Sequence, residues 1–348
     1  MIIEELEKAL QDKKQPKFRL EQIKKAIFKD GASSFSAIRE IPKELAQFLD
    51  ETVDILPFVA VQVLISEDRR SFKALLKLKD GNLIETVLLL PRPTALSVCV
   101  SSQAGCPLGC KFCATGRSGF KRNLTADEIS SQVLFWRQQI KKLGDSDFKF
   151  AASDIKNIVY MGMGEPLLNW ENVKESLRML IDPKLFAFGS RSISVSTSGI
   201  APGIKKFAEE MPQVNLALSL HFADNQKRSQ FMPINKKHDL FDLKKAIQSY
   251  LNITQRKVFI EYLMIDGVND SKEDAEDLVK YIKSMKDSYL LHVNLIRYNA
   301  TSEILKPSSK EKIQEFRDYL MKRGVNTTIR QSLGEEIKAA CGQLAAKV

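Results

Sequence analysis

From about residue 95 onward, apolar strand-like runs alternate with amphipathic helical stretches, and this alternation limits the fold more than any other feature. The expected strands lie at 95–101, 155–161, 192–198, 214–220, 257–265 and 292–298, with a seventh at 325–331. Six βα units in succession predict an α/β fold with a parallel sheet and helices outside, either an open doubly wound sheet or a full or partial barrel. In each case the functional site lies at the carboxyl ends of the strands.

Two of the helical stretches have clear sequence signatures. Thr125 and Glu128 have the spacing of a capping box, so a helix is expected to begin there and to end at Gly144. The stretch 240–251 repeats leucine and isoleucine at helical spacing, which predicts one buried face.

The first 90 residues have a different sequence pattern. Residues 1 to about 50 have helical periodicity, and 58–90 contain three strand-like runs, of which the last two flank Asp80-Gly81, a dipeptide suited to a tight turn. We therefore predict a small α+β domain over 1–90 and a larger α/β domain over 91–348.

Charge and composition indicate a globular protein with an anionic partner. Lysine and arginine number 53 against 43 acidic residues, a formal charge of +10 that suits RNA, although such a charge also serves solubility alone. No apolar run approaches the roughly 18 residues of a membrane span, and the first residues are acidic where a secretory signal would be basic. A cytoplasmic location with reduced thiols is expected.

Three of the five cysteines lie together directly after the first strand of the βα series. Cys106, Cys110 and Cys113 are spaced CxxxCxxC in the loop where such folds place their chemistry. A structural zinc ion would need a fourth ligand from Cys99, Cys341 or a histidine. A 4Fe-4S cluster fits better, because three thiolates hold three irons and leave the fourth open to a ligand.

Glycine and polar residues, with one leucine beside them, recur where the later strands end. They are Gly164, Glu165, Ser196, Ser219, Leu220, His221 and Asn299. Each alone is compatible with an ordinary turn, but together they predict a site for a ligand with amino, carboxylate and hydroxyl groups.

The cysteine spacing resembles the radical S-adenosylmethionine (SAM) superfamily. With CVSSQAGCPLGCKFCATG, MGMGEPLLN, SVSTSGI, MPINKK, GVNDS and AACGQL, essentially the whole chain resembles the radical SAM methyltransferases that modify adenine carbons in RNA. The resemblance implies a partial (βα)6 barrel over 91–348, an accessory RNA-binding domain over 1–90, a 4Fe-4S cluster on the three loop cysteines, and SAM on the strand-end residues.

The resemblance also implies roles for residues outside the loop. Cys341 would accept a methyl group and carry it to adenine, and Cys99 would resolve the resulting adduct and leave a disulfide. Glu85 would remove the ring proton. The alternatives are a small core residue for Cys99 and an exposed strand carboxylate for Glu85.

The implied substrate is carbon 2 of an adenosine in large-subunit (23S) ribosomal RNA, with transfer RNA as a second candidate. The alternatives are the antibiotic-resistance branch of the family, which methylates carbon 8, and a non-catalytic zinc-containing RNA-binding protein. Flavodoxin or ferredoxin would supply electrons. Lys111, Arg117, Lys121 and Arg122 surround the cysteine loop and are candidates for phosphate contacts or solvated surface charge.

Overall fold

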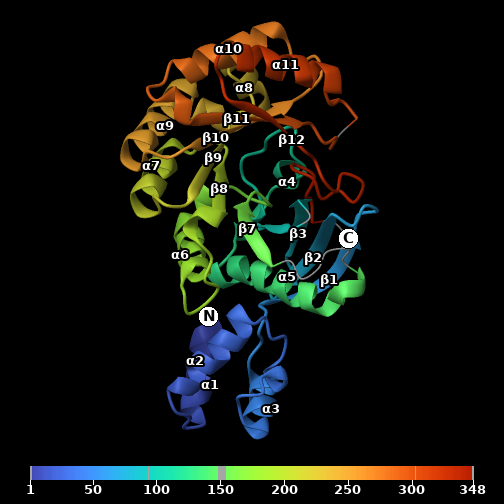
Figure 1. Ribbon diagram of the computed structural model, residues 1–348, viewed down its shortest axis with the longest axis vertical. Coiled ribbons are helices and arrows are strands. Elements are labelled where there is room, and N and C mark those ends of the chain that lie inside the picture. Colours follow the sequence, from blue (N-terminus) through green and yellow to red (C-terminus); the bar gives the residue numbers. More distant parts are fainter. Residues whose placement is uncertain (1, 93, 148–153, 302, 347–348) are drawn as a thin grey trace.

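A ten-stranded sheet forms the centre of the molecule in the computed structural model, which describes residues 2–92, 94–147, 154–301 and 303–346. The strands follow the order β1, β2, β3, β4, β7, β8, β9, β10, β11, β12 across the sheet (Figure 1). Their bounds are β1 Phe58–Ile65, β2 Ser71–Leu78, β3 Leu83–Arg92, β4 Ala95–Cys99, β7 Ile155–Tyr160, β8 Ile193–Thr197, β9 Asn215–Ser219, β10 Val258–Met264, β11 Leu291–Arg297 and β12 Thr327–Arg330.

The sheet has an antiparallel and a parallel part. Strands β1 to β4 form an antiparallel meander, and β4 then begins a parallel series that runs to β12. The seven strands expected from residue 95 onward are all present, so the prediction of an α/β fold with a parallel sheet is confirmed. A separate two-stranded ribbon, β5 Gln103–Gly105 and β6 Phe120–Asn123, closes the base of the cysteine loop.

Helices lie outside the parallel strands, as βαβ connections require (Figure 1). The α-helices are α1 Ile2–Asp12, α2 Phe18–Lys24, α3 Lys43–Thr52, α4 Ala114–Arg117, α5 Ala126–Asp147, α6 Trp170–Ile181, α7 Ala201–Glu210, α8 Asn225–Phe231, α9 Leu240–Thr254, α10 Lys272–Lys283 and α11 Lys310–Lys322. Short helical segments are η1 Lys25–Lys29, η2 Phe35–Ala37, η3 Pro166–Asn169, η4 Ser190–Ser192, η5 Pro233–Lys236 and η6 Ser288–Leu290.

The capping box before α5 forms as predicted. The Thr125 amide donates to the Glu128 carboxylate over 2.9 Å, and the Glu128 amide donates to the Thr125 hydroxyl over 3.2 Å. The helix then continues past Gly144 to Asp147, so the predicted end is wrong by one turn. A glycine weakens a helix interior by only about 1 kcal/mol, which neighbouring residues offset.

The amino-terminal helices and the meander differ in their relation to the barrel. Helices α1 to α3 form a separate lobe at one end of the molecule (Figure 1). In contrast, β3 is hydrogen-bonded to β4, with Val87 opposite Cys99, so the sheet runs without a break through residue 90. The division into 1–90 and 91–348 stays a prediction, and backbone pairing marks no boundary there.

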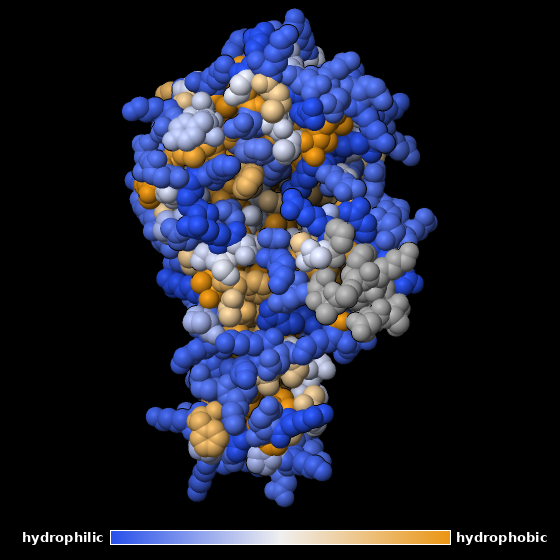
Figure 2. Space-filling model, in the orientation of Figure 1, coloured by the Kyte–Doolittle hydropathy of each residue, from blue (hydrophilic) through white to orange (hydrophobic). Residues whose placement is uncertain are grey.

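Polar and charged side chains cover most of the face shown in Figure 2. Among the helices of the described residues, none has the length and apolarity that crossing a membrane requires.

Candidate active site

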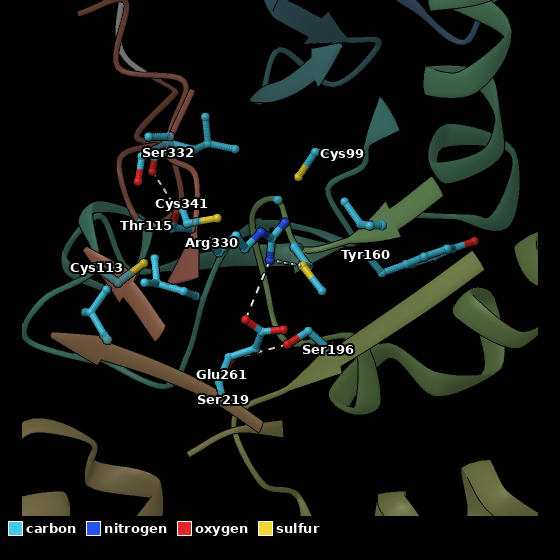
Figure 3. A pocket seen from close by; sticks show the side chains of 18 of the residues that line it. Cys99, Cys113, Thr115, Tyr160, Ser196, Ser219, Glu261, Arg330, Ser332 and Cys341 are labelled. Atoms are coloured by element: carbon cyan, nitrogen blue, oxygen red, sulfur yellow. Dashed lines mark hydrogen bonds and ion pairs between the residues drawn. The ribbon is translucent and has the colours of Figure 1, made fainter. Parts of the chain in front are cut away.

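The carboxyl ends of the parallel strands open onto a cavity of about 500 Å³ (Figure 3). Most of the predicted site residues line it: Cys99, Cys106, Cys110, Cys113, Gly164, Glu165, Ser196, Ser219, His221 and Cys341. Glu85, Leu220 and Asn299 do not line it and are buried directly behind its walls. Residues far apart in the sequence therefore meet at the edge where a parallel α/β sheet places its chemistry.

The three loop cysteines face this cavity from one short segment. The ribbon β5–β6 brings the two ends of their loop together. There the Cys106 amide donates to the Gly119 carbonyl over 2.9 Å. Burial raises the pKa of Cys106 to about 12 and raises the pKa of Cys110 further. Thiols in such surroundings become thiolates only when a metal centre takes the place of the proton.

The spacing of these thiols bears on the kind of metal centre. Within the described ranges, no three His, Cys, Asp or Glu side chains converge closely enough to hold one metal ion. A zinc ion needs four ligands converging on one atom, with sulfurs at about 2.3 Å. In a 4Fe-4S cluster, by contrast, three thiolates each bind a different iron.

Gly164 and Glu165 lie in the loop after β7. Gly164 has φ of +101°, and a Cβ there would lie 2.6 Å from the Gln103 Cβ, so the glycine is required by the neighbouring loop. The Glu165 carboxylate accepts from the Ser198 amide at 2.7 Å and the Leu167 amide at 3.1 Å, while burial raises its pKa.

Further acceptors line the next strand ends. The Ser196 and Ser219 hydroxyls lie 3.2 Å apart. Beside them, Glu261 on β10 accepts from Asn294 at 3.0 Å through one carboxylate oxygen. Its other oxygen is buried and, among the described residues, has no hydrogen-bond partner, only an ion pair of 3.6 Å with Arg330.

Our sequence reasoning did not single out Glu261 and Arg330. A carboxylate inside the apolar run 257–265 was a usable signal for Glu261, because an unpaired acid is rarely buried in a strand. Arg330 ends the seventh strand, where no local pattern marked it.

His221 and Leu220 follow β9. The Leu263 amide donates to His221 Nδ1 over 3.2 Å, which leaves the proton of the neutral ring on Nε2. Burial, aided by the nearby charge of Arg228, lowers the pKa of His221 to about 3. Arg228 is fully buried and donates to the carbonyls of Leu220 and Ser198 at 3.1 and 2.6 Å, so it fixes the ends of two strands.

Cys341 lies on a C-terminal segment that crosses the cavity, which we call the strap (residues 339–346). The Ala114 amide donates to the Gly342 carbonyl at 2.7 Å, and the Thr115 hydroxyl donates to the Leu344 carbonyl at 2.6 Å. Asn299 donates to the Cys341 carbonyl at 3.2 Å, while its own buried Oδ1 has no hydrogen-bond partner in the described part of the chain.

Cys99 lies opposite the strap at the end of β4, and both thiols are free (Figure 3). Burial, together with the proximity of Cys341, raises the pKa of Cys99 to about 12. Arg330 projects into the same space, and its pKa is raised by the nearby Cys341 and Glu261.

Glu85 lies beneath the strap. Its carboxylate forms an ion pair of 2.8 Å with Lys73 and accepts from the amides of Ala345 and Ala346 at 2.7 and 3.1 Å. The exposed-carboxylate alternative is wrong, since only 3% of this residue is accessible. In this arrangement Glu85 anchors the strap.

The basic residues around the loop differ from one another. Arg122 forms an ion pair of 2.8 Å with Glu128 and a second ion pair with Asp80. These two carboxylates neutralise the charge of its guanidinium group. Lys111, Arg117 and Lys121 are exposed, and no carboxylate among the described residues forms an ion pair with them.

The residues present fit an iron-sulfur cluster with SAM. Three thiols face a cavity that also presents a carboxylate oxygen without a hydrogen-bond partner, Glu261 Oε2, and the serine pair of β8 and β9. Acceptors and hydroxyls of this kind suit the ammonium group and ribose of SAM.

The fold and this cavity define a radical SAM enzyme, and residues 100–282 match the family model of the radical SAM superfamily. A probable dual-specificity RNA methyltransferase RlmN of Syntrophomonas wolfei is 41% identical over 98% of this chain and 95% of its own. A ribosomal RNA large subunit methyltransferase Cfr of Bacillus velezensis is 40% identical over 97% and 95%. The crystal structure of a radical SAM methyltransferase from Sphaerobacter thermophilus superposes with a TM-score of 0.90 at 38% identity, covering 99% of this chain and 98% of the other.

The chain therefore belongs to the family of radical SAM RNA methyltransferases that includes RlmN and Cfr. It is an enzyme of methyl transfer, and the cofactors of its family are a 4Fe-4S cluster and SAM.

Proposed function

We propose that this enzyme methylates carbon 2 of an adenosine in large-subunit ribosomal RNA, with transfer RNA as a second substrate. One observation carries the proposal: Cys341 on the strap and Cys99 on β4 face the same cavity as the three loop cysteines. A methyltransferase that acts on a nucleophilic atom needs neither the three loop cysteines nor the pair of Cys99 and Cys341. Methylation of an electron-poor ring carbon needs both a radical and a covalent carrier of the methyl group.

Cys106, Cys110 and Cys113 would hold the cluster, and Glu165, Ser196 and Ser219 would bind SAM. When bound, the reduced cluster supplies the electron that cleaves SAM to a 5′-deoxyadenosyl radical. Cys341, as a thiolate, would accept the methyl group of one SAM and release S-adenosylhomocysteine. Its S-methyl group would then lose a hydrogen atom to the radical from a second SAM, and the carbon radical that remains on Cys341 would add to the adenine ring. Glu85 takes the proton from the ring carbon. The Cys99 thiolate would then attack Cys341 Sγ, so that the bond from sulfur to the carrier carbon breaks and a disulfide forms. The released carbon would take a proton to become the methyl group, and the remaining unpaired electron would return to the cluster.

The base role of Glu85 requires a change at the strap. Its carboxylate is held by Lys73 and by the amides of Ala345 and Ala346. A base must come within hydrogen-bond reach of the proton it removes. We infer that the end of the strap releases Glu85 when the target adenine enters the site.

The Cfr-type alternative is methylation at carbon 8 of adenine. Relatives of both kinds are about equally similar to this chain, at 41% and 40% identity. Glu165-Pro166 followed by LLN supports carbon 2, whereas the segments DPKLFAF and VNLIRYN favour the carbon-8 branch.

The deciding experiment is product analysis. Reconstituted enzyme is incubated anaerobically with ribosomal RNA, SAM and reduced flavodoxin, our proposed electron donor, and the digested nucleosides are compared with synthetic standards by mass spectrometry. We expect 2-methyladenosine, and 8-methyladenosine as the main product would assign the enzyme to the other branch. Because the proposed substrate is ribosomal RNA, we place the enzyme in the cytoplasm.

A further inference from the structure

A second cavity of about 710 Å³ lies on the other side of the strap. Within the strap, Gly342 and Leu344 line the first cavity, whereas Gln343, Ala345 and Ala346 line the second. The strap is therefore the shared wall of two cavities, and it carries Cys341.

Strand β3 runs beneath both cavities. Leu89 lines the first cavity and Leu83 lines the second, and Glu85 lies between them on the same side of the strand because side chains alternate with a period of two. Its carboxylate is bound to the strap amides at 2.7 and 3.1 Å. If the end of the strap moved away, Glu85 would be uncovered at the junction of the two cavities.

The second cavity has the charge expected for a polyanion. Arg117, Lys121 and Lys338 line it, and it is lined by no acidic residue among those the structure describes. No ion pair between described residues involves these three cations, although nearby Arg122 is paired with two carboxylates. Most of the other lining residues are small, which leaves room for a base and a ribose.

We propose that the second cavity binds the RNA nucleotide that carries the target adenine, with Lys121 and Lys338 at its flanking phosphates and the strap as the movable wall between it and the first cavity. The inference rests on the proposed function and adds a substrate site to it. Phosphate contacts of lysine give affinity that is independent of sequence and that falls as salt rises.

Two double variants test the proposal in the full-length reconstituted enzyme. Lys121→Gln with Lys338→Gln removes two charges from the second cavity. Lys283→Gln with Lys322→Gln removes two exposed charges near the carboxyl ends of α10 and α11, so the net charge is the same. Each of these helices runs antiparallel to the strand before it. The carboxyl ends of both helices therefore lie near the amino ends of the strands, away from the site.

The first measurement is the Kd of a fluorescein-labelled RNA stem-loop with one unpaired adenosine, by anisotropy over a series of KCl concentrations. We expect the cavity variant to bind about tenfold more weakly, and its slope of log affinity against log salt to fall by about 1.4, or 0.7 for each lost contact with a single strand. The control variant should bind as the wild type does.

The second measurement uses the unmodified enzyme and so does not depend on the folding of a variant. Lysines are acetylated with and without the stem-loop, and the products are mapped by mass spectrometry. RNA should protect Lys121 and Lys338 and leave Lys283 and Lys322 reactive. Equal binding by both double variants, or unprotected Lys121 and Lys338, would overturn the proposal. Failure of the proposed function can be distinguished from failure of this proposal. In that case the wild type would bind the RNA but form no methyladenosine.

Discussion

At the scale of single residues, the cysteines of the cavity differ in their surroundings. Cys99 is buried and its pKa is raised to about 12, whereas Cys341 lies on the strap and is exposed. A thiol with a high pKa is a poor nucleophile until a positive charge or a partner favours its thiolate. Cys341 is thus placed to react first, and Cys99 is placed to react only when an adduct on Cys341 comes within reach. Arg330, in the same cavity, can stabilise either thiolate.

Replacing each of these cysteines should therefore have a different effect. Cys341→Ala removes the methyl carrier, so neither an RNA adduct nor methyladenosine should form. Cys99→Ala keeps the carrier but cannot resolve the adduct, so a covalent protein–RNA species should accumulate. A denaturing gel with labelled RNA, SAM and reductant distinguishes the two. A Cys99→Ala enzyme with intact iron content and normal turnover would rule out the two-cysteine mechanism.

His221 should make stability depend on pH. The folded pKa is about 3, below the ordinary value of about 6.5, so the unfolded chain binds a proton that the folded chain does not. The free energy of unfolding should therefore fall as pH drops below about 6.5, by up to about 1.4 kcal/mol per pH unit from this group.

The matched variant is His221→Asn. His221 has φ of +59°, a conformation that asparagine tolerates, and the asparagine oxygen can accept from the Leu263 amide as Nδ1 does. Denaturant titrations of cluster-free protein between pH 7 and about 5 should show a shallower pH dependence for the variant than for the wild type. Equal slopes would mean that folding does not lower the pKa of His221.

At the scale of elements, the ribbon β5–β6 determines the shape of the cysteine loop. Gly105 has φ of +79°, and a Cβ there would lie 1.9 Å from the Gly119 carbonyl oxygen. No side chain fits without separating the two strands. The loop between them carries Cys106, Cys110 and Cys113, the proposed cluster ligands, so its closure is a condition for their common orientation.

Gly105→Ala should therefore reduce the iron bound after anaerobic reconstitution to well under half of the wild-type amount. The control is Gly119→Ala in the same ribbon, where φ is +76° but nothing lies within 4 Å of the added Cβ. That variant should carry only the backbone strain, about 1 kcal/mol, and keep its iron. Equal iron loss in both variants would show that iron binding is reduced by backbone strain at a positive φ, rather than by the contact of the added Cβ with the Gly119 carbonyl oxygen.

Elements with a strong local pattern were predictable from the sequence. The strands from 95 onward and the capping box of α5 follow from hydrophobic periodicity and from side chains that bond their own helix end. The three loop cysteines were predictable because their spacing is local. The end of α5 was not, because a glycine weakens a helix interior by only about 1 kcal/mol and so does not by itself end the helix.

Features that depend on distant contacts could not be predicted from local patterns. Arg228 is buried on the short helix α8, and its role appears only when the carbonyls of Ser198 and Leu220 meet it. The anchoring of the strap by Glu85 joins residues 260 positions apart. Gly164 was predicted as a site residue, but the contact that requires a glycine there is with Gln103 on β5, which is distant in the sequence.

At the scale of the whole molecule, the continuous sheet makes the meander part of the catalytic unit. The pairing of β3 with β4 places Lys73 and Glu85 beneath the strap, so a segment outside the matched superfamily region completes the site. The helices α1 to α3 contact the rest of the chain differently. Their lobe is bonded to α5: the Ile2 amide of α1 donates to the Asp127 carboxylate at 2.9 Å, and Gln138 donates to the carbonyl of Ala32, in the loop after η1, at 2.9 Å.

Two truncated chains should consequently behave differently. A chain of residues 54–348 keeps all ten strands and, beneath the strap, both Lys73 and Glu85. It should therefore retain its near-ultraviolet circular dichroism spectrum and bind iron, with reduced stability. A chain of residues 91–348 loses β1, β2 and most of β3. Its β4 becomes an exposed edge whose apolar residues Leu96 and Val98 lose their cover, and such an edge favours aggregation. We expect it to be insoluble or to lack fixed tertiary structure. If residues 91–348 instead form a soluble, iron-binding protein, residue 90 is a true domain boundary, and the pairing of β3 with β4 contributes little to folding.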